Sequence, residues 1–287
     1  MLPLSQSHLS CLDTCARRYE YVYFDSLSGP ASYEQHVYTQ WGSQFHLLMQ
    51  QRALNLPIET LSEVAAELSA SLSALQAAAP EVFEYLSGNI ASNLSTFGQS
   101  EHRRTRTFND YLLTVIYDLV VILEKGTQKQ GLIFDWKTHQ RPPHREQLRR
   151  DWQTRLYLYL LCETSELAPE EISMTYWFGR MTSGVNADKP AGPSCYKFSY
   201  SLAEHDQTRH ELQRLTDQLS NLTHEIEAAE HYPKAAIEKG VCDRCPFNVR
   251  CDRRPPEQAT RLTSTPHPQL LKTARQLGIP EIPEIPL

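Results

Sequence analysis

Two apolar runs that each contain one aspartate constrain the fold of this chain most strongly. Residues 111–123 (YLLTVIYDLVVIL) are nearly continuous in apolar side chains, as expected of a central strand covered on both faces of a sheet. Residues 131–138 (GLIFDWKT) form a second such run, and the glycine at Gly126 marks a turn between them. The pattern predicts two neighbouring central strands, with Asp118 in the first and Asp135 in the second.

The second run carries charged side chains on one face only. Asp135 and Lys137 occupy alternate positions and share a face, while the apolar side chains beside them face a core. Asp118 is costly to desolvate unless it meets a cation or several hydrogen-bond donors. If the two strands pair, Asp118 and Asp135 converge on one divalent ion, and oxygen ligands favour Mg²⁺ or Mn²⁺. Such an ion would polarise a phosphate ester and acidify a water that Lys137 orients. The alternative is a surface ion pair at a strand end.

Helices and further strands surround these two runs. Helices are predicted over residues 4–24, 38–54, 57–97 (more than one helix), 146–163 and 202–230, the last of them long and polar. In 57–97 the apolar residues recur at three- and four-residue steps, as in amphipathic helices. Other strands are predicted over residues 101–107, 171–179 and 194–200. Helices followed by a mixed sheet with a crossover helix form an α/β arrangement. From Pro255 onward the chain is rich in proline, which indicates an extended tail.

Bulk composition excludes some classes of protein. With 287 residues, 40% of them hydrophobic, the chain can bury the core of one domain that carries an insertion. A net charge of −6 excludes a histone-like protein that binds nucleic acid by bulk charge. Basic residues do cluster locally, as at Arg103, Arg104 and Arg106, which is compatible with an acidic nucleic-acid enzyme. The sequence has no signal-peptide run and no membrane span, which predicts a cytoplasmic protein with no membrane partner.

Two of the predicted helices carry polar side chains that could belong to the same site as the two aspartates. His46, in the helix over 38–54, can supply a nitrogen ligand to the same metal ion; a satisfied core histidine is the alternative. Arg149, Gln153 and Tyr157 follow at four-residue spacing on one face of the later helix. A guanidinium, an amide and a phenol in line can contact the phosphates and bases of a strand. The alternative is a flanking polar face.

Three cysteines near the C-terminus form a separate pattern. Cys242, Cys245 and Cys251 have the spacing C-x2-C-x5-C, which argues for a bound metal ion or cluster. Structural disulfides are rare in the predicted compartment. The fourth ligand is not nearby, because the next histidine is His267, in the tail. Zinc with a local histidine is one alternative.

The order of these residues resembles the RecB-like branch of the PD-(D/E)XK nuclease superfamily, which includes AddB and CRISPR-associated exonucleases. The resemblance spans most of residues 1–255. It implies metal binding by His46, Asp118 and Asp135, catalysis by Asp118, Asp135 and Lys137, and DNA contact by Gln153 and Tyr157. The spacing on the helix adds Arg149 to the predicted DNA contacts. Glu101 resembles the acidic residue that often precedes the hairpin, which implies a place near the metal ligands. Val115 departs from the family, which usually has glycine three residues before the first aspartate.

The N-terminal stretch LSQSHLSCLDTCARRYEY resembles the family's opening helix, which ends in Cys-Pro-Arg-Arg-aromatic. In that alignment Cys15 takes the cysteine position, and Cys11 falls one turn earlier, at an ordinary core position. The resemblance implies a 4Fe–4S cluster held by Cys15, Cys242, Cys245 and Cys251. Zinc at the same cysteines is the alternative. The cluster would join the first helix to the cysteine segment, residues 240–254, and stabilise the whole fold.

The same resemblance implies a restriction-endonuclease-like fold, with a mixed sheet flanked by helices. The nuclease domain would cover residues 1–255, with a helical insertion at about 55–99 and a proline-rich tail over 256–287. The implied activity is Mg²⁺- or Mn²⁺-dependent hydrolysis of DNA, by an exonuclease acting on single-stranded or frayed ends in repair, recombination or defence. The alternative is a catalytically silent DNA-binding or scaffold subunit. Because no GxxxxGK[ST] motif is present, a helicase, CRISPR or repair partner would be a separate chain.

Overall fold

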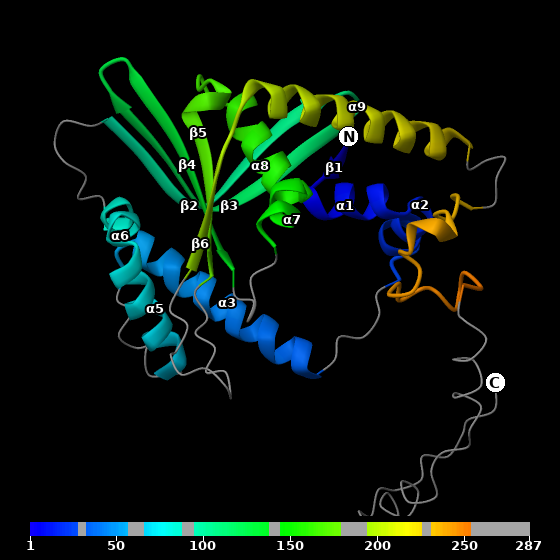
Figure 1. The fold of residues 1–287 in the computed structure, drawn as a ribbon, viewed down its shortest axis with the longest axis horizontal. Helices are drawn as coiled ribbons and strands as arrows, with labels where there is room; N and C mark the ends of the chain where they lie inside the picture. The colour runs from blue at the N-terminus through cyan, green and yellow to red at the C-terminus, as the bar shows by residue number, and fades with distance from the viewer. Residues whose placement is uncertain are drawn as a thin grey trace, which may run out of the picture. The chain divides into compact units, whose positions relative to one another are not determined.

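The computed structural model describes residues 1–27, 33–56, 66–87, 95–137, 144–178, 194–225 and 231–253. The chain forms two compact units, Met1–Tyr232 and Pro233–Leu287. The first unit is a mixed α/β fold whose six-stranded sheet is flanked by helices (Figure 1), as the sequence predicts. Such an architecture is consistent with a restriction-endonuclease-like fold. None of the helices in the described ranges is long and apolar enough to cross a membrane.

The sheet has the strand order β1-β3-β4-β5-β6, with β2 paired to β3. Its strands are β1 (Leu2–Leu4), β2 (Ser95–Phe108), β3 (Tyr111–Lys125), β4 (Gln128–Lys137), β5 (Ile172–Phe178) and β6 (Ser194–Ser199). Strands β2, β3 and β4 are antiparallel, whereas β1 pairs with β3, and β5 with β4, in parallel. The helix predicted over 4–24 would begin at Leu4, which is instead the last residue of β1. Three residues show no periodicity, and this strand forms only because β3 offers it a partner.

The helices are α1 (Gln6–Thr14), α2 (Ala16–Tyr19), α3 (Tyr33–Ala53), α5 (Ala66–Ala78), α6 (Pro80–Ser87), α7 (Arg145–Arg150), α8 (Trp152–Glu163) and α9 (Leu202–Glu225). A π-helical segment, η1 (Glu20–Phe24), follows α2. The single helices predicted over 4–24 and 146–163 are both wrong. The first is interrupted at Cys15 and the second at Asp151, and both residues have extended backbones. Asp151 also caps α8, because its side chain accepts a hydrogen bond from Gln153 N at 2.9 Å.

The predicted insertion is helical in α5 and α6, but its last residues belong to β2, which begins at Ser95. Residues 57–65 and 88–94 lie outside the described ranges. The proline-rich tail over 256–287 lies outside them as well.

The sheet separates two hydrophobic cores. Helices α1, α8 and α9 supply the core on one face, and α3, α5 and α6 the core on the other (Figure 1). Phe134 and Trp136 of β4 belong to the second core, and Ile133 to the first. Strand β4 is therefore buried on both faces, contrary to our expectation of one core face. Asp135, on the face of Ile133, is only 2% exposed because α8 covers it.

The second unit, described as far as residue 253, consists of turns. A 3-10 turn, η3 (Ile237–Lys239), ends at Gly240, whose φ of 63° favours glycine. The cysteine segment follows: Cys245 N donates to Cys242 O at 3.1 Å, and Lys234 Nζ donates to Cys251 O at 2.9 Å. Its three cysteines are all half-buried.

Candidate active site

Asp118 lies where strands β3 and β4 part. The antiparallel ladder between them ends at the pair Leu119 and Phe134, and the far end of β3 pairs with β1 instead. Asp118 Oδ2 accepts a hydrogen bond of 2.7 Å from the main-chain nitrogen of Trp136. The carboxylate thus satisfies a backbone donor that has lost its strand partner. This pairing explains how an otherwise apolar strand tolerates an aspartate.

Glu101 of β2 is the residue opposite Asp118, because Ser100 pairs with Leu119 in this antiparallel ladder. Its φ of 49° lies in the left-handed region, which costs a non-glycine residue roughly 1–3 kcal/mol. Strain of this kind collects at functional sites, where the surrounding structure maintains it. Here it accompanies a carboxylate placed beside Asp118.

His46 reaches the same point from α3. Its Nε2 lies 3.1 Å from the carbonyl oxygen of Trp136, which can only accept, so Nε2 is the donor. The other nitrogen, Nδ1, lies 3.4 Å from Asp118 Oδ1 and 4.0 Å from Glu101 Oε1. In the neutral ring, the lone pair of Nδ1 therefore faces two carboxylates, which is the orientation of a metal ligand.

These three residues form the candidate metal site. One ligand atom from each of His46, Glu101 and Asp118 lies within 4.8 Å of the other two. One nitrogen and two carboxylates from three elements suit a divalent ion such as Mg²⁺ or Mn²⁺. We predicted His46 and Asp118 as ligands, and the structure brings them together. Glu101, expected only near the ligands, joins them directly, whereas Asp135 is not part of this group.

Asp135 lies next to this group in a buried network with Lys137 and Gln153. Lys137 Nζ is 2.7 Å from Asp135 Oδ1 and donates to Gln153 Oε1 at 2.7 Å, while Gln153 Nε2 donates to Asp135 Oδ2. Both carboxylate oxygens of Asp135 therefore have a partner, and Lys137 supplies the positive charge that a buried carboxylate needs. Burial, with the charge of Asp118, raises the pKa of Asp135 to about 6, although Lys137 opposes the shift.

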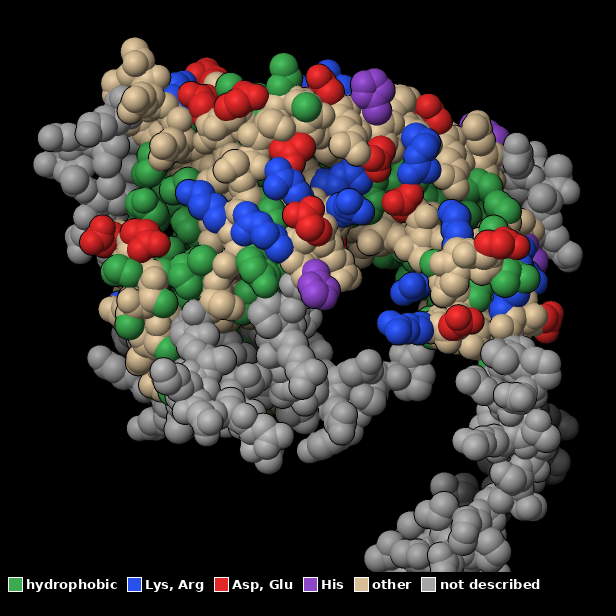
Figure 2. Space-filling model, in the orientation of Figure 1, with side chains coloured by type: hydrophobic (Ala, Val, Ile, Leu, Met, Phe, Trp, Pro, Cys, Tyr) green, Lys and Arg blue, Asp and Glu red, His purple; other side chains and the backbone are tan. Residues whose placement is uncertain are grey.

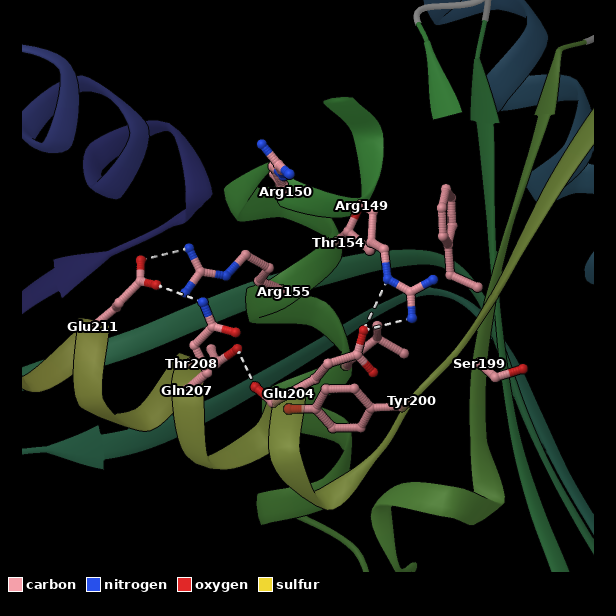
Figure 3. Close-up of a pocket in the computed structure, with 12 residues that line it drawn as sticks. Arg149, Arg150, Thr154, Arg155, Ser199, Tyr200, Glu204, Gln207, Thr208 and Glu211 are labelled. Atoms are coloured by element: carbon pink, nitrogen blue, oxygen red, sulfur yellow. Dashed lines mark hydrogen bonds and ion pairs between the residues drawn. The ribbon is translucent and has the colours of Figure 1, made fainter. Parts of the chain in front are cut away.

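The other two predicted DNA contacts lie elsewhere. Tyr157 is buried, and its hydroxyl donates to the Ile116 carbonyl at 2.8 Å, which fixes β3 two residues before Asp118. Arg149 lies on α7, in an ion pair of 2.6 Å with Glu204 of α9. It lines a cavity of about 510 Å³ between α7, α8 and α9 (Figure 3). The helix break at Asp151 removes Arg149 from the face of Gln153. Contact of these residues with DNA remains a prediction.

Basic side chains gather over this part of the surface. Figure 2 shows Lys and Arg side chains in the middle of the face that it presents, with acidic side chains between them. Arg145, Arg149 and Arg150 of α7 are exposed. Arg145 Cζ lies 4.9 Å from the centre of the Phe198 ring. Such a mixed surface indicates solvated ion pairs as readily as a track for nucleic acid.

We expect Mn²⁺ to stabilise the protein more at pH 7.5 than at pH 5.5. Burial lowers the pKa of His46, but the hydrogen bond and charge of Asp118 outweigh it and raise that pKa. Burial and Asp118 also raise the pKa of Glu101, as they do that of Asp135. All three groups therefore hold protons more tightly in the metal-free folded protein than in the unfolded chain. The protonated forms of these groups therefore stabilise the folded, metal-free protein at low pH. This stabilisation is lost as the pH rises through the pKa values that the groups have in the folded protein.

Metal ions compete with those protons, so binding should release protons and strengthen with pH. Near saturation at pH 7.5, Mn²⁺ should raise Tm by roughly 5–10 °C. Thermal unfolding at both pH values, with and without Mn²⁺, measures the difference. Glu101→Gln should reduce the Mn²⁺ effect, and an equal rise in Tm at both pH values would contradict the prediction.

Comparison with known proteins agrees with this geometry. The model of the PD-(D/E)XK nuclease superfamily matches residues 3–252, and the chain belongs to that superfamily. The crystal structure of SSO0001 matches at 15% identity over 88% of this chain and 86% of that one, with a TM-score of 0.31. A likeness that weak supports no conclusion about the fold. No curated protein matches the sequence significantly.

Proposed function

We propose that this chain is a RecB-like, Mg²⁺- or Mn²⁺-dependent deoxyribonuclease that hydrolyses single-stranded or frayed DNA from its ends. The observation that supports it most is the convergence of His46, Glu101 and Asp118 beside a buried Asp135–Lys137 pair. Membership of a nuclease superfamily agrees with this. A role in repair, recombination or defence, with a separate helicase or CRISPR-type partner, belongs to the same proposal.

Each residue has a distinct task in this proposal. His46, Glu101 and Asp118 hold the divalent ion, and Asp135, paired with Lys137, adds a buried carboxylate beside them. The ion, when bound, supplies Lewis acidity toward a phosphoryl oxygen. Lys137 Nζ is a fixed cation that offsets charge developing on the phosphate, and Gln153 keeps it beside Asp135. A catalytically silent scaffold subunit would not need these metal-binding and catalytic residues, and each of them is present in this chain.

The experiment is a comparison of DNA forms, with protein purified anaerobically. Labelled linear single strands, blunt duplexes, duplexes with single-stranded overhangs and circular single strands are incubated with Mn²⁺ or with EDTA. We expect Mn²⁺-dependent shortening of the linear single strands and overhangs, with the circles intact. Cleavage of circles would contradict the preference for ends. Binding without cleavage of any form would favour the silent subunit.

A further inference from the structure

A second cavity shares a wall with the candidate metal site. Its volume is about 280 Å³, and Glu101 lines it together with Gln50, Leu54, Tyr85, Gly98 and Leu119. Leu119 and Tyr85 pack with the core formed by α3, α5 and α6, so the cavity lies on that face of the sheet. Glu101 is therefore common to the candidate metal site and this cavity.

The residues that line this cavity disfavour the binding of a phosphate group. No lysine or arginine is among the residues that line the cavity, and Glu101 carries the negative charge there. Gln50 offers an amide, Tyr85 an aromatic ring and Leu54 an aliphatic surface. A neutral, flat group with hydrogen-bonding edges fits this lining, in which Gln50, Gln99 and Ser100 are polar and Leu54, Tyr85 and Leu119 are apolar. A nucleobase has that chemistry.

Gly98 gives an independent reason to expect a ligand. It lies within strand β2, where glycine weakens the strand unless a backbone or ligand approaches closely. A β-carbon added at Gly98 would meet nothing nearer than Tyr85 O at 3.9 Å and a Val121 methyl at 4.0 Å. Gly131 differs, because its β-carbon would lie 2.6 Å from a Leu167 methyl group. Packing therefore disfavours a side chain at 131 but not at 98, where the glycine lines the cavity.

We propose that this cavity is a nucleobase subsite. It takes the unstacked base of the nucleotide next to the phosphate held at the candidate metal site. The inference rests on the proposed nuclease function and adds a physical basis for single-strand preference. A paired base must be unpaired and unstacked before it can enter, at a cost that a frayed or single strand avoids. Tyr85 contributes the aromatic contact that non-specific single-strand binding uses.

The test fills the cavity without touching the metal ligands. Gly98→Val adds three carbons at a position whose β-carbon meets only ordinary contacts, and valine favours a strand. Wild type and variant are compared on a linear single-stranded oligonucleotide and on its copy with abasic tetrahydrofuran residues at the cleaved end. Wild type should show a KM roughly tenfold or more higher for the abasic copy, as expected for the loss of one stacked base. Gly98→Val should raise KM for the normal oligonucleotide to a similar degree, so that the variant has the same KM for both oligonucleotides.

Two further variants keep the result interpretable. Tyr85→Leu removes the ring and should reduce the discrimination without filling the cavity. Thr105→Val, an exposed site on the same strand outside the cavity, should discriminate as wild type does. Equal KM values for both oligonucleotides with wild type, or equal slowing of both by Gly98→Val, would overturn the subsite.

Binding of the two oligonucleotides, followed by fluorescence anisotropy, separates this proposal from the nuclease itself. If no DNA is cleaved, the proposed function fails, yet tighter wild-type binding of the normal oligonucleotide, lost in Gly98→Val, would still support the subsite. Equal binding of both by wild type would overturn it.

Discussion

Replacing Lys137 by methionine should lower kcat for DNA hydrolysis by roughly 10²–10³-fold while metal binding persists. Lys137 Nζ lies 2.7 Å from both Asp135 Oδ1 and Gln153 Oε1, so it is a cation fixed in place before substrate arrives. It is not one of the three residues that form the candidate metal site. Single-turnover cleavage of a linear single strand measures the loss, and the rise in Tm with Mn²⁺ reports whether metal still binds.

The pH profile distinguishes the loss of this charge from general damage. Lys137 lowers the pKa of Asp135, which burial and Asp118 raise to about 6. Without Lys137 that pKa rises further, so the residual activity should need a higher pH than wild type. Lys129→Met is the matched control: Lys129 is on the same strand, pairs with Glu166 at 2.9 Å, and should be dispensable. Equal activity in the two variants would contradict the role given to Lys137.

The strands around the site were predictable because their signals are local. A continuous apolar run, a turn and a second run predict β3 and β4 to within a few residues. Alternation along β4 places Asp135 and Lys137 on one face, and in the structure they form an ion pair. Burial of that face by α8 was not predictable, since it depends on how a distant helix packs.

The position of Glu101 opposite Asp118 could have been predicted by counting residues from the turn between the two strands. Asn109 and Asp110 form the turn between β2 and β3, and a two-residue turn fixes the register of both strands. That register places residue 101 opposite Asp118. Its positive φ and the approach of His46, by contrast, depend on tertiary structure and leave no mark in a single sequence.

The misplacement of Arg149 has a local cause that the sequence does contain. An aspartate that precedes an apolar helical stretch is a preferred N-cap, and Asp151 stands in that position before Trp152. Had the helix been started there, Arg149 would not share a face with Gln153 and Tyr157. Four-residue spacing identifies a common face only when one helix continues through all the positions.

Replacing Cys242 by serine should remove the iron and lower the stability of the protein by about 3 kcal/mol. The expectation rests on our proposal that Cys15, Cys242, Cys245 and Cys251 hold a 4Fe–4S cluster. Cys15 lies at the break between α1 and α2 and is half-buried, whereas Cys11 is in the core. That difference supports Cys15 as the fourth ligand.

The expected loss of stability depends on a second set of contacts made by the N-terminal segment, which needs no metal ion. Buried Glu20 lies 2.9 Å from His231 Nδ1 and accepts a hydrogen bond of 2.9 Å from Tyr232 N, while Arg17 Nε donates to Tyr232 O at 2.6 Å. These contacts already join the N-terminal segment to Tyr232 and so close the long loop. The cluster would then close only a loop of about 15 residues, worth about 3 kcal/mol, against roughly 5.4 kcal/mol for the long loop alone.

Iron content, visible absorbance and Tm of anaerobically purified variants measure these effects. Cys15→Ala should behave as Cys242→Ser does, whereas Cys195→Ser, exposed on β6, should match wild type. In an Arg17→Ala, Glu20→Ala background, which removes both contacts with Tyr232, the cluster would be the main closure of the long loop, so its loss should cost more than in the wild-type background. Cys15→Ala with unchanged iron, absorbance and Tm would contradict the cluster assignment. Zinc in place of iron would favour a zinc site at the same cysteines. The expected loss of stability would then be similar, because it depends on which residues the metal joins and not on which metal joins them.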